Sequence, residues 1–208
     1  FIKNIIYKKI SPKLIFVSNN FKFGNKRKGN VNLLKKFGKK YDYKLIKINP
    51  FRNQGKMISS TGIRKCLQTG NLDLANKLLS RTWFIDGHVK KGKKLGRKLG
   101  YRTCNIYIKN YILPKMGIYA IKVAIGNKRK MYNGIGYLGS RPTFGGKEIF
   151  LEVNIFGIQK KLYKKRLRVY FIKFIRMDKK FKNSAKLINQ MNKDVIFAKK
   201  GLKTKLVL

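Results

Sequence analysis

The chain has 208 residues, of which 43% are hydrophobic and 12% aromatic, enough to form the core of one large or two small domains. Lysine and arginine together number 52 against 7 acidic residues, so the formal net charge is +45. The hydrophobic content argues against wholesale disorder, and no apolar run reaches the roughly 18 residues that a membrane-spanning helix needs, so we expect no membrane partner.

The first part of the chain has the pattern of an α/β unit. Residues 13–21 read as a buried strand, residues 31–41 have helical spacing, and residues 43–49 read as a second strand. This order predicts part of a Rossmann-like α/β module with a parallel sheet. Residues 58–79 then predict two short amphipathic helices, broken near Gly70, with an N-cap supplied from Ser59-Ser60-Thr61.

The pattern changes at Trp83, after which short β-branched and aromatic segments alternate with turn residues. Several such strands without a helix between them predict a small closed antiparallel β-barrel. Residues 182–202 read as a closing amphipathic helix with Leu187, Met191 and Ile196 inward. We therefore expect an α+β chain of two parts, residues 1–80 and residues 81–208.

A basic, glycine-rich loop lies between the first two predicted barrel strands. It reads GHVKKGKKLGRKLGYRTCN over residues 87–105, and Gly92, Gly96 and Gly100 recur within it. Glycines let backbone amides approach an anion closely, and the oxygens of Thr103 and Asn105 suit Mg²⁺ held jointly with phosphates. In a chain this basic, a solvated hairpin is the alternative interpretation.

A lone acid stands in the apolar segment FLEVN. Glu152 is either a solvent-facing residue on an alternating strand or a general base beside a nucleophilic hydroxyl. Its neighbour Glu148 lies in the turn GGKE, where we expect it to be exposed.

Together these segments resemble a known family. From residue 83 to about 200 the chain is similar to riboflavin kinase, through GHVKKGKKLGRKLGYRTCNI, PKMGIYAIKV, GIGYLGSRPTF, LEVNIF, LYKKRLRVYFIKFIR and the final helix. The part before it resembles the FMN adenylyltransferase (FAD synthetase) module that is fused to this kinase in bacteria, through FKFGNKRKGN and ISSTGIR. The order and spacing of these blocks are much more specific than any one glycine loop.

The resemblance implies a role for each candidate residue. The loop with Gly92, Gly96, Arg97 and Gly100 would cover the phosphates of ATP, while Thr103 and Asn105 would hold Mg²⁺ and phosphate. Glu152 would take the proton from the riboflavin hydroxyl as FMN forms, and Arg176 would lie near the flavin. In the other module, which makes FAD from FMN and ATP, Ser60 and Arg64 would contact phosphate.

The chain also departs from the family pattern at several positions. Arg102 replaces a usual proline, Asn154 a frequent histidine, Asp178 a common glutamate, and Ser18-Asn19-Asn20 a usual Gly-Asp-Asp. The upstream H-x-G-H motif is absent and the first residue is Phe1, so we expect the start of the first module to be missing and this chain not to make FAD. The sole histidine, His88, is expected at the surface.

Two other functions remain as alternatives, a basic nucleic-acid-binding protein and an inactive remnant of the enzyme. The lysines are spread along the whole chain, which AT-rich codon usage explains better than one specific nucleic-acid partner does. The two cysteines, Cys66 and Cys104, are too few for a disulfide framework and favour a reducing, cytoplasmic location.

Overall fold

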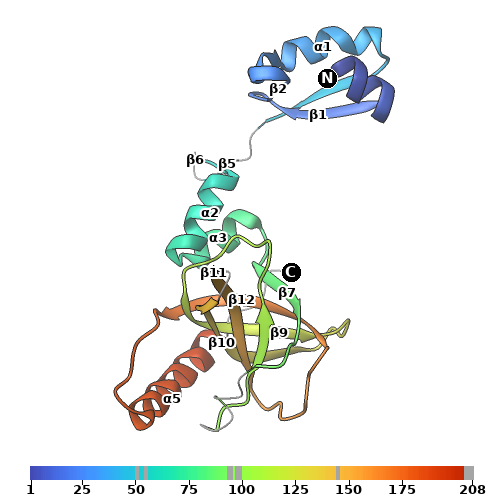
Figure 1. The fold of residues 1–208 in the computed structure, drawn as a ribbon. Coiled ribbons are helices and arrows are strands. Elements are labelled where there is room, and N and C mark those ends of the chain that lie inside the picture. The colour runs from blue at the N-terminus through green and yellow to red at the C-terminus, as the bar shows by residue number, and fades with distance from the viewer. Residues whose placement is uncertain (50–51, 54–55, 93–95, 97–99, 144–145, 204–208) are drawn as a thin grey trace. The chain divides into compact units, whose positions relative to one another are not determined.

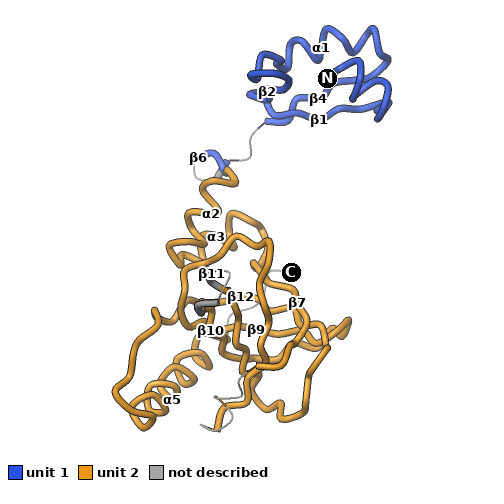
Figure 2. Tube along the Cα trace, in the orientation of Figure 1, with its two compact units in different colours: residues 1–58 blue, residues 59–208 orange. Residues whose placement is uncertain are grey.

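The computed structural model describes residues 1–49, 52–53, 56–92, 96, 100–143 and 146–203 (Figure 1). The chain forms two compact units, Phe1–Ile58 and Ser59–Leu208 (Figure 2). The division that the sequence predicted near residue 80 therefore falls inside the second compact unit. No helix in the described part of the chain is both long enough and apolar enough to span a membrane.

The first unit is built around a parallel pair of strands. Its elements are η1 (Ile2–Ile10), β1 (Leu14–Ser18), β2 (Lys22–Phe23), η2 (Asn25–Arg27), β3 (Gly29–Asn30), α1 (Val31–Lys40), β4 (Lys44–Ile48), β5 (Arg52–Asn53) and β6 (Lys56–Met57). β1 pairs in parallel with β4, and α1 is the crossover between them. The predicted strand, helix and strand are thus present as a partial Rossmann-like unit, and they are preceded by η1, which was not predicted.

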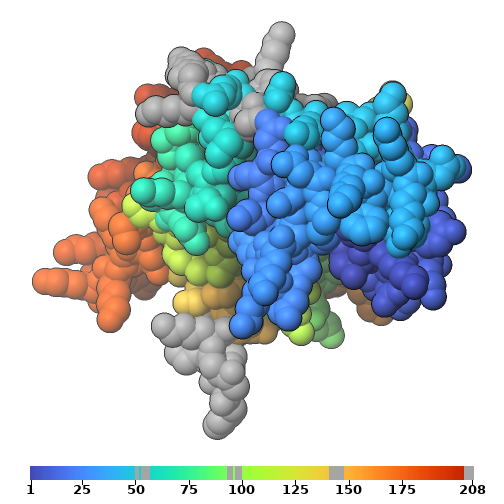
Figure 3. Space-filling view, turned by 90° about the horizontal axis from the view of Figure 1, so that it is seen from above, coloured from blue at the N-terminus to red at the C-terminus, as the bar shows by residue number. Residues whose placement is uncertain are grey.

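Buried apolar side chains hold the first unit together. Leu34 on α1 is fully buried, and the cluster around it includes Val17 from β1 and Ile6 from η1. The Asn30 side chain caps α1 by accepting from the Leu33 amide at 3.0 Å. Figure 3 draws the residues of this unit in space-filling form, in blue and cyan.

The second unit is a nearly closed barrel with helices. Its elements are α2 (Ser60–Thr69), α3 (Leu72–Leu79), β7 (Phe84–His88), β8 (Cys104–Tyr107), β9 (Gly117–Ile125), β10 (Met131–Thr143), β11 (Gly146–Ile155), β12 (Arg166–Arg176) and α5 (Ser184–Gly201). The six strands pair antiparallel in the order β7-β12-β9-β10-β11-β8. One bridge joins the outer two strands, where the Lys90 amide after β7 donates to the Asn105 carbonyl at 2.9 Å.

Alternation along the strands separates an inner from an outer face of the barrel. Leu151 and Val153 on β11 are fully buried in the barrel core, so the residues between and beside them point outward. The helices α2 and α3 add Leu67, Leu72 and Ala75 to this same core. This packing explains why these helices belong to one compact unit with the barrel, although the strand pattern begins only at Trp83.

The C-terminal helix α5 packs on the outside of β9, β10 and β12. The prediction that Leu187 and Met191 face inward agrees with their position on a cavity. The same prediction for Ile196 is wrong, because this side chain is 58% exposed. A helical stripe that passes through 187 and 191 continues at 194, 195 and 198, so Asp194 and Ala198 occupy the buried positions instead.

Candidate active site

A cavity of about 390 Å³ lies between the outer face of the barrel and α5. Four of the predicted site residues line it: Gly96, Thr103, Glu152 and Arg176. The rest of its lining comes from three places: strands β9, β10 and β11 (Ile118, Ile135, Gly136, Tyr137, Asn154), the segments beside β8 and β12 (Tyr101, Asp178, Lys179, Phe181), and α5 (Leu187, Met191, Asp194, Val195). Residues that are far apart in the sequence therefore meet at one cleft.

Strand register places Glu152 at the centre of this site. Glu152 on β11 lies opposite Asn105 on β8 and opposite Tyr137 on β10. Side chains directly opposite in an antiparallel pair share a face, with Cβ atoms about 4.5–5.5 Å apart. The predicted metal-binding residue Asn105 and the predicted base Glu152 are therefore neighbours, and Thr103, two residues before Asn105, lies in the same cavity as Glu152.

The glycines of the basic loop lie against the two predicted metal ligands. A Cβ atom on Gly92 would be 2.2 Å from Nδ2 of Asn105, which is only 6% exposed. A Cβ atom on Gly96 would be 2.8 Å from the Tyr101 carbonyl oxygen and 3.3 Å from Oγ1 of Thr103. At these two positions glycine is required by close approach, whereas Gly100 is required by its φ of +83°. The predicted phosphate ligand Arg97 lies outside the described residues.

Arg176 is held in a buried ion pair that sequence reasoning missed. Its Nε donates to both carboxylate oxygens of Asp194 on α5, at 2.9 and 3.0 Å, and its Nη2 donates to Oδ2 at 2.6 Å. The two side chains are 15% and 5% exposed, and Gln190 also donates to Asp194 at 2.9 Å. The pairing of β12 with β9 shifts register between Phe174 and Arg176, so the regular alternation of the strand is interrupted at this arginine.

Tyr137 is a second residue that sequence reasoning missed. Its hydroxyl donates to Oδ2 of Asp178 at 2.7 Å, and its ring meets the Phe150 ring edge-on at 5.7 Å between centroids. Burial raises the pKa of the Tyr137 phenol, and the hydrogen bond to Asp178 and the charge of Glu152 raise it further. The phenol is therefore a neutral hydrogen-bond donor at physiological pH.

Two smaller hollows adjoin the 390 Å³ cavity. One of about 100 Å³ has apolar walls that include Val89, Ile155 and Leu162, with Lys160 and Lys161 also in its lining, and Thr103 lines both this hollow and the large cavity. The other, of about 340 Å³, lies between residues 100–102, the turn after β11 and α5. Arg102, which stands where proline is usual, donates to the Gln159 carbonyl and so joins the glycine loop to this turn. Asn154 donates its amide to the Arg102 carbonyl at 2.7 Å.

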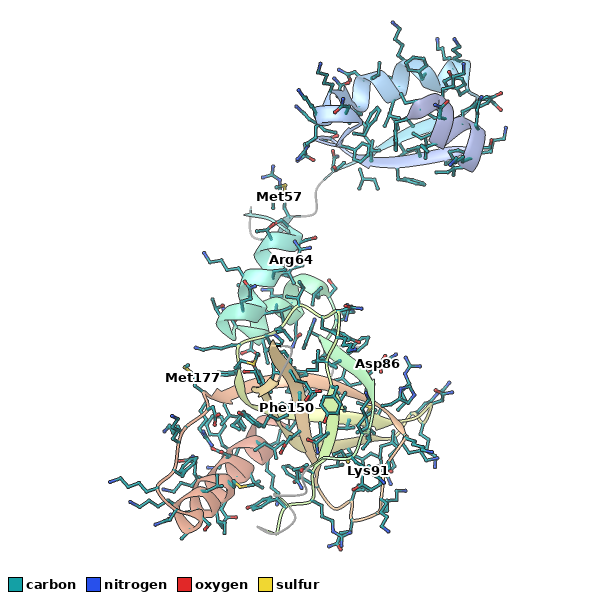
Figure 4. The ribbon with its side chains drawn as sticks, in the orientation of Figure 1. Met57, Arg64, Asp86, Lys91, Phe150 and Met177 are labelled. Carbon is teal, nitrogen blue, oxygen red and sulfur yellow. The ribbon has the colours of Figure 1, made fainter. Side chains whose placement is uncertain are left out.

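Ser60 and Arg64, the predicted phosphate ligands of the other module, lie on α2 and are both exposed. Figure 4 labels Arg64 on this helix. The helix cap is Ser59, whose hydroxyl accepts from the Gly62 amide at 3.1 Å. Four residues apart, Ser60 and Arg64 share one face of the first turns of the helix. His88 is exposed at the end of β7, as predicted.

The types of side chain near the cavity limit how a metal ion could be bound there. Within the described residues no group of three or more histidine, cysteine or acidic side chains could hold a metal ion. A hydroxyl at Thr103 and an amide oxygen at Asn105 are hard oxygen donors that fit Mg²⁺, which keeps several waters and binds mainly through phosphates. Thr103, which lines two of the hollows, therefore fits a magnesium ion that arrives with a nucleotide, whereas Asn105 has suitable donor chemistry but is buried and lines none of the three hollows.

Comparisons with known proteins identify relatives of this chain. A family model described as riboflavin kinase matches residues 79–202, and one described as FAD synthetase matches residues 1–62. The bifunctional riboflavin kinase/FMN adenylyltransferase of Buchnera aphidicola subsp. Schizaphis graminum is 40% identical over 203 residues, covering 96% of this chain and 65% of that protein. The protein of the same name from Escherichia coli K12 is 33% identical over 199 residues, covering 96% of this chain and 63% of that protein.

One solved structure also covers most of the chain. A crystal structure described as a macrolide-efflux protein from Streptococcus pneumoniae matches with a TM-score of 0.76 at 31% identity, covering 90% of this chain and 60% of that chain. This chain spans only about 65% of the length of the Buchnera protein. Because the riboflavin kinase match extends over more than half of the residues, the chain belongs to the riboflavin kinase family.

Proposed function

We propose that this chain transfers the terminal phosphoryl group of ATP to the primary hydroxyl of riboflavin, giving FMN and ADP. The observation that carries the proposal is that Gly96, Thr103 and Glu152 line one cavity, with Gly96 packed beside Thr103. A nucleic-acid-binding protein has no use for a carboxylate in such a cleft.

The 390 Å³ cavity and the 100 Å³ hollow beside it suggest where the two substrates bind. The cavity between the barrel and α5 has apolar walls, among them Ile118, Phe181 and Met191, which suit the flat flavin ring. The 100 Å³ hollow has Lys160 and Lys161 in its lining, and these cations suit part of the ATP molecule. Because Thr103 lines both, molecules in the two hollows would meet beside it, which is where the phosphoryl group has to pass.

The reaction needs mainly positioning and neutralisation of charge. The oxygen of the riboflavin hydroxyl forms a bond to the γ-phosphorus as the bond from that phosphorus to the bridging oxygen of ADP breaks. Glu152 accepts the proton that the hydroxyl loses. Thr103 and Asn105 would hold a magnesium ion bound to the phosphates, and this ion would supply neutralisation of the negative charge.

Arg176 is proposed to act on the flavin side. Its bonds to Asp194 fix the plane of the guanidinium at the wall of the cavity, so that it presents one defined edge to the flavin. Arg97 and Gly100 are proposed to contact ATP phosphates together with Gly92 and Gly96.

The segment that matches FAD synthetase is proposed to belong to a module that adenylylates FMN. Residues 1–62 contain the parallel β1–β4 pair and end within α2, where Ser60 and Arg64 are exposed and accessible to a phosphate-bearing ligand. In this proposal the product of the kinase reaction is the substrate of the adenylylation.

The proposal is tested by incubating the chain with riboflavin, ATP and Mg²⁺ and measuring FMN by chromatography. Glu152→Gln should lower kcat by about 10²–10⁴-fold, the usual contribution of a positioned general base, and leave riboflavin binding nearly unchanged. Glu148→Gln is the matched control, because Glu148 lies on the same strand and lines none of the three hollows. No FMN from the unmodified chain would overturn the function, and equal turnover by Glu152→Gln would remove Glu152 from its role.

A further inference from the structure

Tyr137 is fixed beside Glu152 by three separate contacts. Its position in the β10–β11 register puts it directly opposite Glu152 on the outer face. Its ring lies over Gly139, where an added Cβ atom would be 2.5 Å from the phenol oxygen and 2.6 Å from Cζ. The edge-on contact with Phe150 supports the ring from β11. Gly139 and Phe150 therefore determine where the phenol points.

The phenol points to Asp178, in the segment between β12 and α5. Oδ2 of Asp178 accepts from Tyr137 at 2.7 Å, and Oδ1 accepts from the Lys179 amide at 2.8 Å. This segment also supplies Lys179 and Phe181 to the lining of the cavity. The Tyr137–Asp178 bond is thus a link from strand β10 to the segment that leads to α5.

Glu152 has a different neighbour on each of the two strands that pair with β11. On the β8 side, Asn105 lies opposite Glu152 and Gly92 lies against Asn105. On the β10 side, Tyr137 lies opposite Glu152 and is tied to Asp178. Tyr137, Asp178 and Glu152 all line the large cavity, so this link forms part of its wall beside Glu152.

We propose that the Tyr137–Asp178 bond is a clasp that closes the β10 side of the Glu152 cavity, holds the flavin there and keeps water from the reacting phosphate. The inference rests on the proposed kinase function and names Tyr137 as a positioning residue. Without the clasp, a water oxygen attacks the γ-phosphorus in place of the riboflavin oxygen. The bond to the bridging oxygen then breaks, Glu152 takes the proton, and the products are ADP and inorganic phosphate.

The test compares ADP formed with FMN formed in the same reaction. Tyr137→Phe keeps the ring and removes only the hydroxyl, and Asp178→Ala removes the acceptor, which is exposed. Both variants should form ADP in excess of FMN and should raise KM for riboflavin about tenfold, the factor for losing one hydrogen bond of ordinary net strength to a charged group. The double variant should add little to either single change, because both remove the same bond.

Tyr132→Phe is the control, since Tyr132 is on the same strand and lines none of the three hollows. A general loss of structure would lower ADP and FMN together, whereas loss of the clasp changes their ratio. If the unmodified chain forms FMN and both clasp variants keep its ratio and its KM, the inference is overturned and the proposed function stands. If the unmodified chain forms no FMN, the proposed function fails and the inference fails with it.

Discussion

Replacing Asp194 by asparagine should destabilise the second unit strongly. The change keeps the shape of the side chain and removes the charge that faces the buried guanidinium of Arg176. Removing one partner of a buried ion pair usually costs about 3–5 kcal/mol, because the remaining charge is left without compensation. Arg176 retains 15% exposure at the cavity wall, where water can partly solvate it, so we expect about 3 kcal/mol, the lower end of that range.

Trp83 provides the assay for this change. It is the only tryptophan in the chain, it is buried in the core of the second unit, and its ring packs on Phe171 at 5.0 Å between centroids. Its fluorescence therefore follows the unfolding of this unit alone. For a unit of this size, 3 kcal/mol corresponds to a fall in Tm of roughly 6–12 °C.

A paired replacement separates the lost charge from lost packing. Arg176→Met combined with Asp194→Leu removes both charges and fills their space with apolar atoms, which is often neutral or stabilising at a buried pair. We expect the double variant to recover most of the stability that Asp194→Asn loses. Ordinary surface substitutions change the free energy of unfolding by up to about 0.5 kcal/mol. If Asp194→Asn lowers the free energy of unfolding by less than this, the stability of the unit does not depend on a negative charge beside Arg176.

Two further changes test the metal site and the outer surface of the barrel. Thr103→Ala should raise the Mg²⁺ concentration for half-maximal FMN formation about tenfold, as loss of one ligand from a shared site does; an unchanged requirement in a Mg²⁺ titration would exclude Thr103 as a ligand. Burial raises the pKa of Asp86, but hydrogen bonds from Arg168 and Arg166 outweigh it and lower the pKa overall. Because its pKa is lower in the folded state, the ionised Asp86 carboxylate stabilises the folded protein. This stabilisation is present above the unfolded-state pKa near 4 and is lost as pH falls through the lower folded-state pKa. Denaturant unfolding should therefore show an advantage of about 1 kcal/mol over Asp86→Asn at pH 6 that shrinks toward pH 3, and a constant difference would contradict it.

Local pattern was sufficient for most elements and for the face on which Glu152 lies. The polar residues before the helices indicated where they start, and the predicted Ser59 to Thr61 start of α2 has Ser59 as its cap. The alternation around Leu151 and Val153 showed that Glu152 points away from the barrel core. What the alternation could not decide was whether the outward face is solvent or a cleft, because α5 that covers it comes from residues 184–201.

The residues that were missed depend on contacts between distant segments. Asp194 stands in the polar run NQMNKDV, where an acid is typical of a solvated helix face, and only the fold brings it to Arg176. Tyr137 stands in a strand between hydrophobic neighbours, and its direction is set by Gly139 and Asp178. The division near residue 80 was predicted from where strands begin, which carries no information on which core α2 and α3 join.

Two glycines of the basic stretch, Gly92 and Gly96, pack against the residues at the start of β8, which is why the combined spacing is more informative than either segment alone. Gly92 lies against the Asn105 side chain, and Gly96 lies against the Tyr101 carbonyl and the Thr103 side chain. A side chain at Gly92 would occupy the space of the Asn105 amide itself. A solvated basic hairpin has no such requirement, because its loop touches only water. The contacts at Gly92 and Gly96 therefore favour packing against the two proposed ligand residues over a solvated hairpin, which the lysine content of this stretch could not have decided.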